Sequence, residues 1–206
     1  ISLGGGTTLY YPLREKDNFR LDVDDFISHL NESIDLIVIC NPNNPTSSCI
    51  TRTEMRHILD ACKEHDIYVM VDETYVEFTN TKIYSSTPLV DKHDNLFVIR
   101  GTSKFFSTPG IRLGYGLIGN CDVKNKINDN LDLWNINIIA SAMGEIMFTD
   151  EKYINHCADI FLKERDYLYK SLSDFKNLKV YESKGNFILC KIIYLFAKLF
   201  ILLCKD

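Results

Sequence analysis

Side chains capable of acid–base or nucleophilic chemistry lie in three short polar segments, each of which follows a run of apolar residues. The first segment spans 41–46 and includes Asn44, and the second spans 72–75 and includes Asp72 and Tyr75. The third spans 101–104 and includes Ser103 and Lys104, and Arg112 follows shortly after it. An amine is a potential nucleophile, and a carboxylate is a potential proton acceptor. Together the segments offer an amide, a carboxylate, a phenol, a hydroxyl, an amine and a guanidinium.

The apolar runs before these segments predict buried strands at 36–40, 67–71 and 96–99, with a fourth strand at 115–118. Residues 51–54 have the spacing of a capping box and predict the start of a helix. Strand, helix, strand is the pattern of an α/β fold. Ligands of such sheets bind beyond the carboxyl ends of the strands, so the three polar segments are expected at one edge. The apolar face of the helix is expected to consist of Met55, Ile58, Leu59 and Cys62.

A second, smaller α+β region is predicted to begin near residue 150. Residues 137–148 and 151–175 are expected to be helical, and 178–181 and 186–190 are expected to be short strands. We therefore predict two parts, a larger one at 1–149 and an incomplete smaller one at 150–206. The apolar run at 192–204 is interrupted by a lysine and is shorter than the roughly 20 residues of a membrane-spanning helix. It is expected to be a buried or interfacial element.

Each polar feature alone has an ordinary structural explanation. A Pro/Asn segment is usually only a turn, an aspartate after a strand is often a helix cap, and a lone lysine is usually a surface residue. Cys49 lacks a partnered base in the sequence and is expected to be an unreactive thiol. Trp134 is expected to pack in the core or at a subunit interface rather than to stack on a nucleobase. The functional inference therefore depends on the arrangement of the segments.

Composition argues against several classes of function. The formal net charge of -5 gives no indication of binding to nucleic acid or to an anionic membrane. The seven cysteines include no CxxC pair, which is typical of a reduced, cytoplasmic protein. The five histidines form no group with metal-ligand spacing. No GxGxxG motif follows the first strand, as a dinucleotide-binding dehydrogenase would require.

Taken together, the motifs NPNNPT, VDETYVEF and RGTSKFFSTPGIRLGYG resemble the signature of pyridoxal-phosphate (PLP) enzymes of aminotransferase class I/II, fold type I. Histidinol-phosphate aminotransferases and threonine-phosphate decarboxylases are the most similar members, over roughly residues 1 to 190. The resemblance implies a large domain with a mostly parallel sheet flanked by helices, followed by part of a small α+β domain. It also implies a homodimer.

The resemblance implies a role for each of six residues. Lys104 resembles the lysine that holds PLP as an internal aldimine and shuttles a proton. Asp72 resembles the carboxylate that pairs with the pyridine nitrogen, and a nearby carboxylate does favour a protonated nitrogen. Tyr75 and Asn44 resemble the two groups that form hydrogen bonds with the phenolic oxygen of PLP. Ser103 and Arg112 resemble two of the residues that bind its phosphate.

The implied reaction is transfer of an amino group between an amino acid, or an amino-phosphate, and a 2-oxo acid. Two alternatives remain open: a threonine-phosphate-type decarboxylase, and a non-catalytic, truncated copy. The sequence departs from the family at Gly101, where many members carry Ser or Thr, and at Ser47, where many carry Gly. The family's glycine-rich phosphate loop and stacked aromatic residue do not precede the first strand, and no arginine follows Arg165 as a substrate clamp. The chain is therefore expected to be partial.

Overall fold

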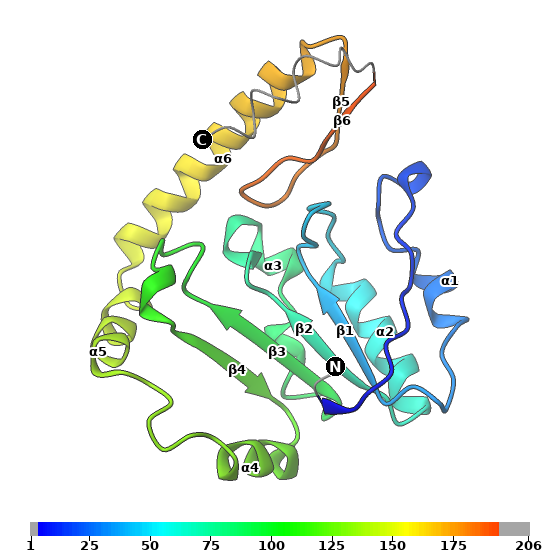
Figure 1. Cartoon of the computed structure of the whole chain (residues 1–206), viewed down its shortest axis with the longest axis vertical. Helices are drawn as coiled ribbons and strands as arrows, with labels where there is room; N and C mark the ends of the chain where they lie inside the picture. The colour runs from blue at the N-terminus through cyan, green and yellow to red at the C-terminus, as the bar shows by residue number, and fades with distance from the viewer. Residues whose placement is uncertain (1–3, 194–206) are drawn as a thin grey trace.

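The structure is a computed structural model that describes residues 4–193. Its main sheet has four strands in the order of the chain: β1 (Leu36–Cys40), β2 (Tyr68–Asp72), β3 (Leu96–Gly101) and β4 (Gly114–Ile118). The strands β1, β2 and β3 are parallel, and β4 is antiparallel to β3 (Figure 1). The expected α/β fold with a mostly parallel sheet is confirmed, as are the four strands.

The antiparallel direction of β4 agrees with a connection from β3 that contains no α-helix. A parallel return needs a crossover of a dozen or more residues that is usually built around an α-helix. The connection from Gly101 to Gly114 contains only the 3-10 turn η5 (Pro109–Ile111). The chain therefore turns back, and Gly101 pairs with Gly114.

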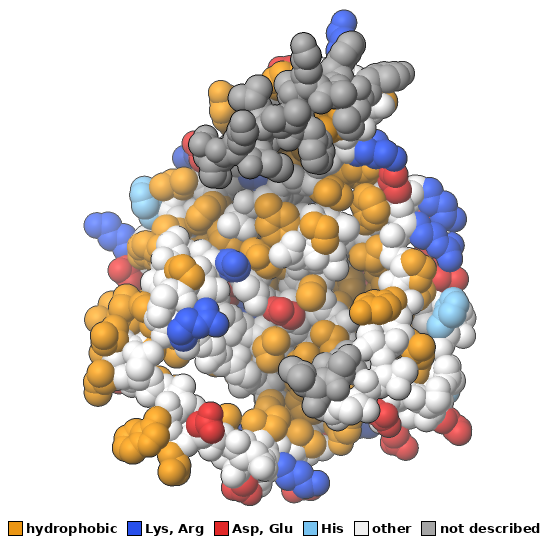
Figure 2. Space-filling view, viewed as in Figure 1, with side chains coloured by type: hydrophobic (Ala, Val, Ile, Leu, Met, Phe, Trp, Pro, Cys, Tyr) orange, Lys and Arg blue, Asp and Glu red, His pale blue; other side chains and the backbone are white. Residues whose placement is uncertain are grey.

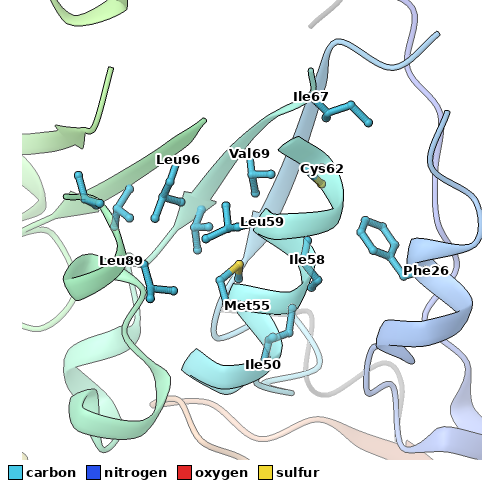
Figure 3. Close-up of a cluster of buried hydrophobic side chains, with 13 residues drawn as sticks. Phe26, Ile50, Met55, Ile58, Leu59, Cys62, Ile67, Val69, Leu89 and Leu96 are labelled. Atoms are coloured by element: carbon cyan, nitrogen blue, oxygen red, sulfur yellow. The ribbon is translucent and has the colours of Figure 1, made fainter. Parts of the chain in front are cut away.

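Helix α2 (Arg52–Glu64) connects β1 to β2 and packs on one face of the sheet. The predicted capping box is confirmed: the Glu54 N–H donates to Thr51 Oγ1 at 3.3 Å, and the Thr51 N–H donates to Glu54 Oε2 at 2.8 Å. The four predicted apolar residues of α2 are all fully buried. They form the main hydrophobic core with side chains of β2, β3 and the short helix α1 (Val23–Ile27) (Figure 3).

The opposite face of the sheet is only partly covered within residues 4–193. Parallel sheets are normally covered on both faces. Here Leu36 and Val38 of β1 are 43% and 42% exposed, and Tyr68, which is register-paired with Leu36, is 36% exposed. Figure 2 shows hydrophobic side chains spread over the sheet on the side from which it is viewed. The described residues alone therefore leave apolar surface of the sheet in contact with solvent.

The remaining elements lie in the connections and in the second part of the chain. Helices α5 (Ile138–Met147) and α6 (Glu151–Ser173) confirm the two predicted helices, and β5 (Leu178–Val180) pairs antiparallel with β6 (Cys190–Ile192). The prediction of a strand at 186–190 was wrong, because only Cys190 of that range is in a strand. Just before this range, the backbone N–H groups of Lys184 and Gly185 donate to the Ser47 hydroxyl oxygen. These hydrogen bonds bend the chain there out of an extended conformation. Not anticipated were η2 (Glu15–Asp17), η3 (Val76–Phe78), α3 (Thr81–Tyr84), η4 (Thr87–Leu89) and α4 (Cys121–Asp129).

Several expectations concern the end of the chain and the exposed surface. The division at 149/150 stays a prediction, and the apolar run at 192–204 lies mostly outside the described residues. Among residues 4–193, no helix has the length and apolar character needed to cross a membrane. Trp134 is 92% exposed, so the expectation that it packs in the core of this chain was wrong. It lies in the loop between α4 and α5, where residues 130–137 are all exposed in the described part of the chain.

Candidate active site at the carboxyl edge of the sheet

The three polar segments lie at the same edge of the sheet, as predicted. Asp72, the last residue of β2, is register-paired with Cys40 at the end of β1 and with Ile99 near the end of β3. Because these strands are parallel, the segments that follow them emerge on the same side. Lys104 lies in the turn after β3.

Asn44, Tyr75 and Lys104 come from three different segments and are brought together. The Asn44 side-chain amide donates to the Tyr75 hydroxyl at 3.4 Å. Lys104 Nζ lies 5.9 Å from the centre of the Tyr75 ring, within the range of a cation–π contact. Lys104 and Asn44 are exposed and Tyr75 is half-buried, so all three polar groups can be reached by a ligand.

A buried asparagine shapes the loop that carries Asn44. The Asn41 side chain donates to the carbonyl oxygens of Ile50 at 2.9 Å and Tyr84 at 3.0 Å, and it accepts from the Ile50 N–H at 2.9 Å. Satisfying all these groups makes a buried amide stabilising rather than costly. Asn41 thus closes the loop between β1 and α2 and ties it to the end of α3.

Asp72 is half-buried, and its carboxylate accepts hydrogen bonds from the residue after next. Its Oδ1 accepts from the Thr74 N–H at 2.9 Å and from Thr74 Oγ1 at 2.5 Å. A carboxylate oxygen that accepts two hydrogen bonds is held in one orientation. Among the described residues, the other Asp72 oxygen accepts no hydrogen bond.

Ser103 and Arg112 belong to the connection between β3 and β4. The Thr102 N–H donates to the Leu113 carbonyl at 3.1 Å, which extends the β3–β4 pairing one residue beyond Gly101 and Gly114. Ser103 and Arg112 occupy the next position on each side. Arg112 adopts the left-handed conformation (φ 59°), and one of its guanidinium nitrogens, Nη1, donates to the Pro109 carbonyl at 3.1 Å.

The six predicted residues are therefore not equally connected. Asn44, Tyr75 and Lys104 form a chain of contacts, whereas no hydrogen bond or ion pair within residues 4–193 joins Asp72, Ser103 or Arg112 to those three. All six lie at the same sheet edge or in the connections that leave it. Their roles toward a cofactor stay predictions.

Buried aromatic side chains anchor the turn that carries Lys104. Phe105 and Phe106 directly follow the lysine and are 1% and 9% exposed. The Phe105 ring lies 5.5 Å from that of Phe78, and the Phe78 ring lies 4.7 Å from that of Phe161 in α6. Such edge-to-face contacts add to the stabilisation that comes from burial. The exposed Lys104 is thus followed directly by two buried, well-packed aromatic side chains that hold its turn in place.

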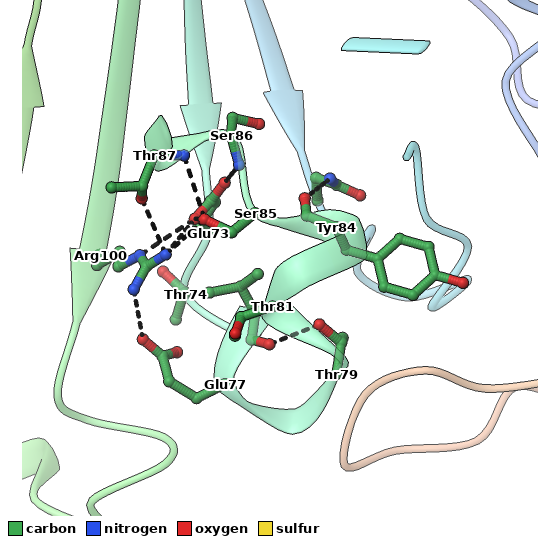
Figure 4. A network of polar contacts seen from close by, with 12 residues as sticks. Glu73, Thr74, Glu77, Thr79, Thr81, Tyr84, Ser85, Ser86, Thr87 and Arg100 are labelled. Carbon is green, nitrogen blue, oxygen red and sulfur yellow. Dashed lines mark hydrogen bonds and ion pairs between the residues drawn. The ribbon is translucent and has the colours of Figure 1, made fainter. Parts of the chain in front are cut away.

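A polar network beside the site was not anticipated from the sequence (Figure 4). Glu73, adjacent to Asp72, is fully buried and pairs with Arg100 of β3 at 2.7 Å. Glu73 also accepts from the Ser85 hydroxyl at 3.1 Å and from the Ser86 N–H. Arg100 contacts a second carboxylate, Glu77, at 3.4 Å. The network joins the ends of β2 and β3, and the only signal in the sequence was the opposite charge of residues at two neighbouring strand ends.

Burial within this network changes how Glu77 titrates. Burial raises the pKa of Glu77 to about 7, and the positive charge of Arg100 only partly opposes the increase. Glu77 Oε2 is buried and has no hydrogen-bond partner among the described residues. The carboxyl therefore titrates near neutral pH instead of in its ordinary acidic range.

The thiols near the site are poor nucleophile candidates. Burial raises the pKa of Cys49 to about 12, and burial, together with the charge of Asp72, raises the pKa of Cys40. Few thiolates exist near pH 7 under these conditions. Within residues 4–193 no cluster of three or more His, Cys, Asp or Glu side chains is arranged to hold a metal ion. One surface pocket lies beside Arg165 and Lys184, and another lies beside Glu32 and His65.

Comparison with known proteins gives a consistent result. The model of the family "Aminotransferase class I and II" matches residues 1–194. A protein of Caldanaerobacter subterraneus subsp. tengcongensis named "Putative threonine-phosphate decarboxylase" is 38% identical over 93% of this chain and 52% of its own length. The histidinol-phosphate aminotransferase of Clostridium kluyveri is 36% identical over 92% of this chain and 52% of its own length.

A solved structure shows the same arrangement of elements. The crystal structure of the histidinol-phosphate aminotransferase from Clostridium acetobutylicum superposes with a TM-score of 0.82 and 30% identity. It covers 89% of this chain, and this chain covers 54% of it. The chain thus spans about half the length of the curated relatives and solved structures that it matches.

Proposed function

Because the chain belongs to the aminotransferase class I and II family, we propose that it carries the PLP-binding site of an aminotransferase, with Lys104 as the lysine that binds PLP. The proposed reaction transfers an amino group between an amino acid, or an amino-phosphate, and a 2-oxo acid. The observation that carries the proposal is the position of Lys104, exposed beside the hydrogen-bonded pair of Tyr75 and Asn44 and anchored by Phe105.

The donor set at the sheet edge fits PLP. Lys104 Nζ is the amine that would bond to the aldehyde, and the Asp72 carboxylate would hold a proton on the pyridine nitrogen. Asn44 and the Tyr75 hydroxyl, which already lie within hydrogen-bond distance of each other, would both contact the phenolic oxygen. PLP, when bound, supplies an electron sink for bonds at the α-carbon of the substrate.

The chain's own residues account for the remaining requirements of the reaction. The Lys104 amine, when it is not bonded to PLP, would lie where it could accept a proton from the α-carbon of the substrate and later donate a proton to the product. Ser103 and Arg112, at the end of the β3–β4 pairing, would bind the phosphate, for which an arginine fork is well suited. The packed aromatic residues beneath the turn limit the freedom of Lys104 to move away.

Binding of PLP to Lys104 can be tested directly. Addition of PLP to the full chain should produce a visible absorbance band, and borohydride reduction should fix a pyridoxyl group on Lys104, which mass spectrometry of the peptides would locate. The Lys104→Ala variant should lose the band, whereas Lys126→Ala, at an exposed site in α4, should retain it. The absence of any band in the unmodified chain at saturating PLP would refute the proposal.

Two alternatives to amino transfer can be distinguished by assay. The relative with 38% identity bears the name of a threonine-phosphate decarboxylase, which supports decarboxylation. The second alternative is a non-catalytic copy, which only measurements of activity can decide. Amino transfer to 2-oxoglutarate and release of CO2 from amino-phosphates distinguish the first two reactions. A PLP band with neither activity would favour the non-catalytic copy.

We also propose that the protein forms a homodimer in the cytoplasm. Leu133, Trp134 and Ile138 are each at least 85% exposed and lie close together in the chain, as side chains at a subunit interface do. The cysteines in the described part of the chain are unpaired, which suits a reducing compartment. Sedimentation velocity would determine the state of association.

A further inference from the structure

A buried serine links the first site loop to a distant part of the chain. Ser47 is fully buried and adopts the left-handed conformation (φ 58°), which glycine reaches more easily than serine. Its side-chain oxygen accepts hydrogen bonds from the Lys184 N–H at 2.8 Å and the Gly185 N–H at 2.6 Å. The Ser183 hydroxyl lies 3.0 Å from the same oxygen. A glycine at this position would leave these buried donors without that acceptor.

Further contacts hold the segment 183–187 in the same place. The Arg165 guanidinium of α6 donates to the Lys184 carbonyl at 2.8 Å and to the Phe78 carbonyl at 3.2 Å. The Ser183 hydroxyl lies 2.5 Å from the Phe187 carbonyl oxygen, which closes the segment into a tight loop. In Figure 1 this loop, between β5 and β6, reaches toward the carboxyl edge of the sheet.

The fastened segment contacts the candidate active site. The Phe187 ring packs edge-on against the Tyr75 ring, with centres 5.0 Å apart and an interplanar angle of 82°. On the other side, the Ser47 N–H donates to the Asn43 carbonyl at 2.6 Å, next to Asn44. Ser47 is thus connected to Asn44 through the loop backbone and to Tyr75 through the segment 183–187.

We infer that Ser47 is a positioning residue whose hydroxyl fastens the segment 183–187 over Tyr75 and thereby holds the Asn44–Tyr75 pair in place for the cofactor. The fastening itself does not depend on the proposed function, whereas the effect on the cofactor rests on it. The physical reason is that one hydroxyl oxygen accepts from two N–H groups of a segment far away in the sequence, a half-buried one and a buried one. Without this acceptor, the Lys184 N–H has no partner among the described residues, and the Gly185 N–H keeps only the longer hydrogen bond to the Ser183 hydroxyl at 3.2 Å, so the segment is held less tightly.

Limited proteolysis tests the fastening without any cofactor. Trypsin cleaves after lysine, and the Lys184 peptide bond lies within the fastened segment. Ser47→Gly removes the hydroxyl and suits the left-handed backbone, so the fold should persist. We expect cleavage after Lys184 to become at least tenfold faster relative to cleavage after exposed Lys124 in the same digest. Asp66→Gly is the matched control, because Asp66 is exposed, also adopts a left-handed conformation (φ 57°) and lies between α2 and β2, away from Lys104.

The second readout concerns the cofactor. Ser47→Gly should weaken binding of PLP about fivefold and shift the pH at which the visible band changes, because both Asn44 and Tyr75 gain freedom. Asp66→Gly should do neither. Equal cleavage of the unmodified chain and Ser47→Gly after Lys184 would overturn the fastening. Faster cleavage with unchanged PLP affinity and an unchanged pH profile would overturn the positioning role. A chain that forms no PLP band would refute the proposed function and the positioning role together, and the digest would still decide the fastening.

Discussion

The buried carboxyl of Glu77 should make the stability of this protein depend on pH in a way that a single substitution removes. Glu77 lies in η3, between the sheet edge and the packed aromatic residues, and its side chain is 20% exposed. Burial raises its pKa from 4.5 to about 7, although Arg100 lies 3.4 Å away. In the unfolded chain the same carboxyl titrates near its ordinary value.

The sign and size of the effect follow from proton linkage. Between pH 4.5 and about pH 7 the folded state binds more protons at Glu77 than the unfolded state does. The stabilisation is therefore fully present below pH 4.5 and is lost as the pH rises through about 7. Each unit of pKa difference corresponds to about 1.4 kcal/mol, so the free energy of unfolding should fall by about 2.5 kcal/mol from roughly pH 5 to pH 8 on account of Glu77.

Glu77→Gln tests this reasoning, because an amide resembles the protonated carboxyl and does not titrate. Urea unfolding at several values between roughly pH 5 and pH 8 should show the variant gaining stability over the unmodified chain as the pH rises, by about 2.5 kcal/mol across the range. Glu145→Gln, at an exposed position in α5, should give a constant difference. Parallel pH profiles for the unmodified chain and Glu77→Gln would refute the assignment of a raised pKa to this residue.

Two further predictions concern the scaffold around the site. Arg100→Met should lower the free energy of unfolding by about 3–5 kcal/mol, because it leaves the fully buried Glu73 without its cationic partner. Arg20→Met breaks a surface ion pair and should lower the free energy of unfolding by at most about 1 kcal/mol. Similar costs for the two variants in urea unfolding would contradict the importance of burial. Thr51→Ala should cost about 1 kcal/mol through loss of the helix cap, and Thr53→Ala, at an exposed position in the first turn, should cost less; thermal melts of both variants would check the order.

Local features of the fold could be predicted because nearby residues specify them. The capping box at Thr51 depends on a side chain three residues away, and the buried face of α2 follows from the spacing of residues such as Ile58 and Leu59. The strands β1, β2 and β3 consist mostly of apolar residues in short runs, a pattern that favours a parallel sheet. The common edge of the three polar segments follows from this topology.

Other features depend on which parts of the chain meet, and the sequence alone did not reveal them. The direction of β4 depends on the connection that follows Gly101, which contains a 3-10 turn and no α-helix. The expected strand at 186–190 was displaced because the preceding residues bind Ser47, which lies 137 positions from Lys184 in the chain. The pairing of Glu73 with Arg100 spans 27 positions. No periodicity within one helix or strand carries information about such contacts.

The sequence by itself therefore determined the chemical identity of the candidate site: the types and order of its six residues, and the sheet edge at which they emerge. Only the tertiary structure decided which of them touch, because a contact such as that between Asn44 and Tyr75 depends on how whole loops are packed. The tertiary structure also decided which polar groups are buried away from water. Burial raises the pKa of Glu77, and the folded chain places the Ser47 hydroxyl where it accepts hydrogen bonds from a distant loop. Desolvation and long-range hydrogen bonding are properties of the folded chain, so they can be identified only from the tertiary structure that places these groups together.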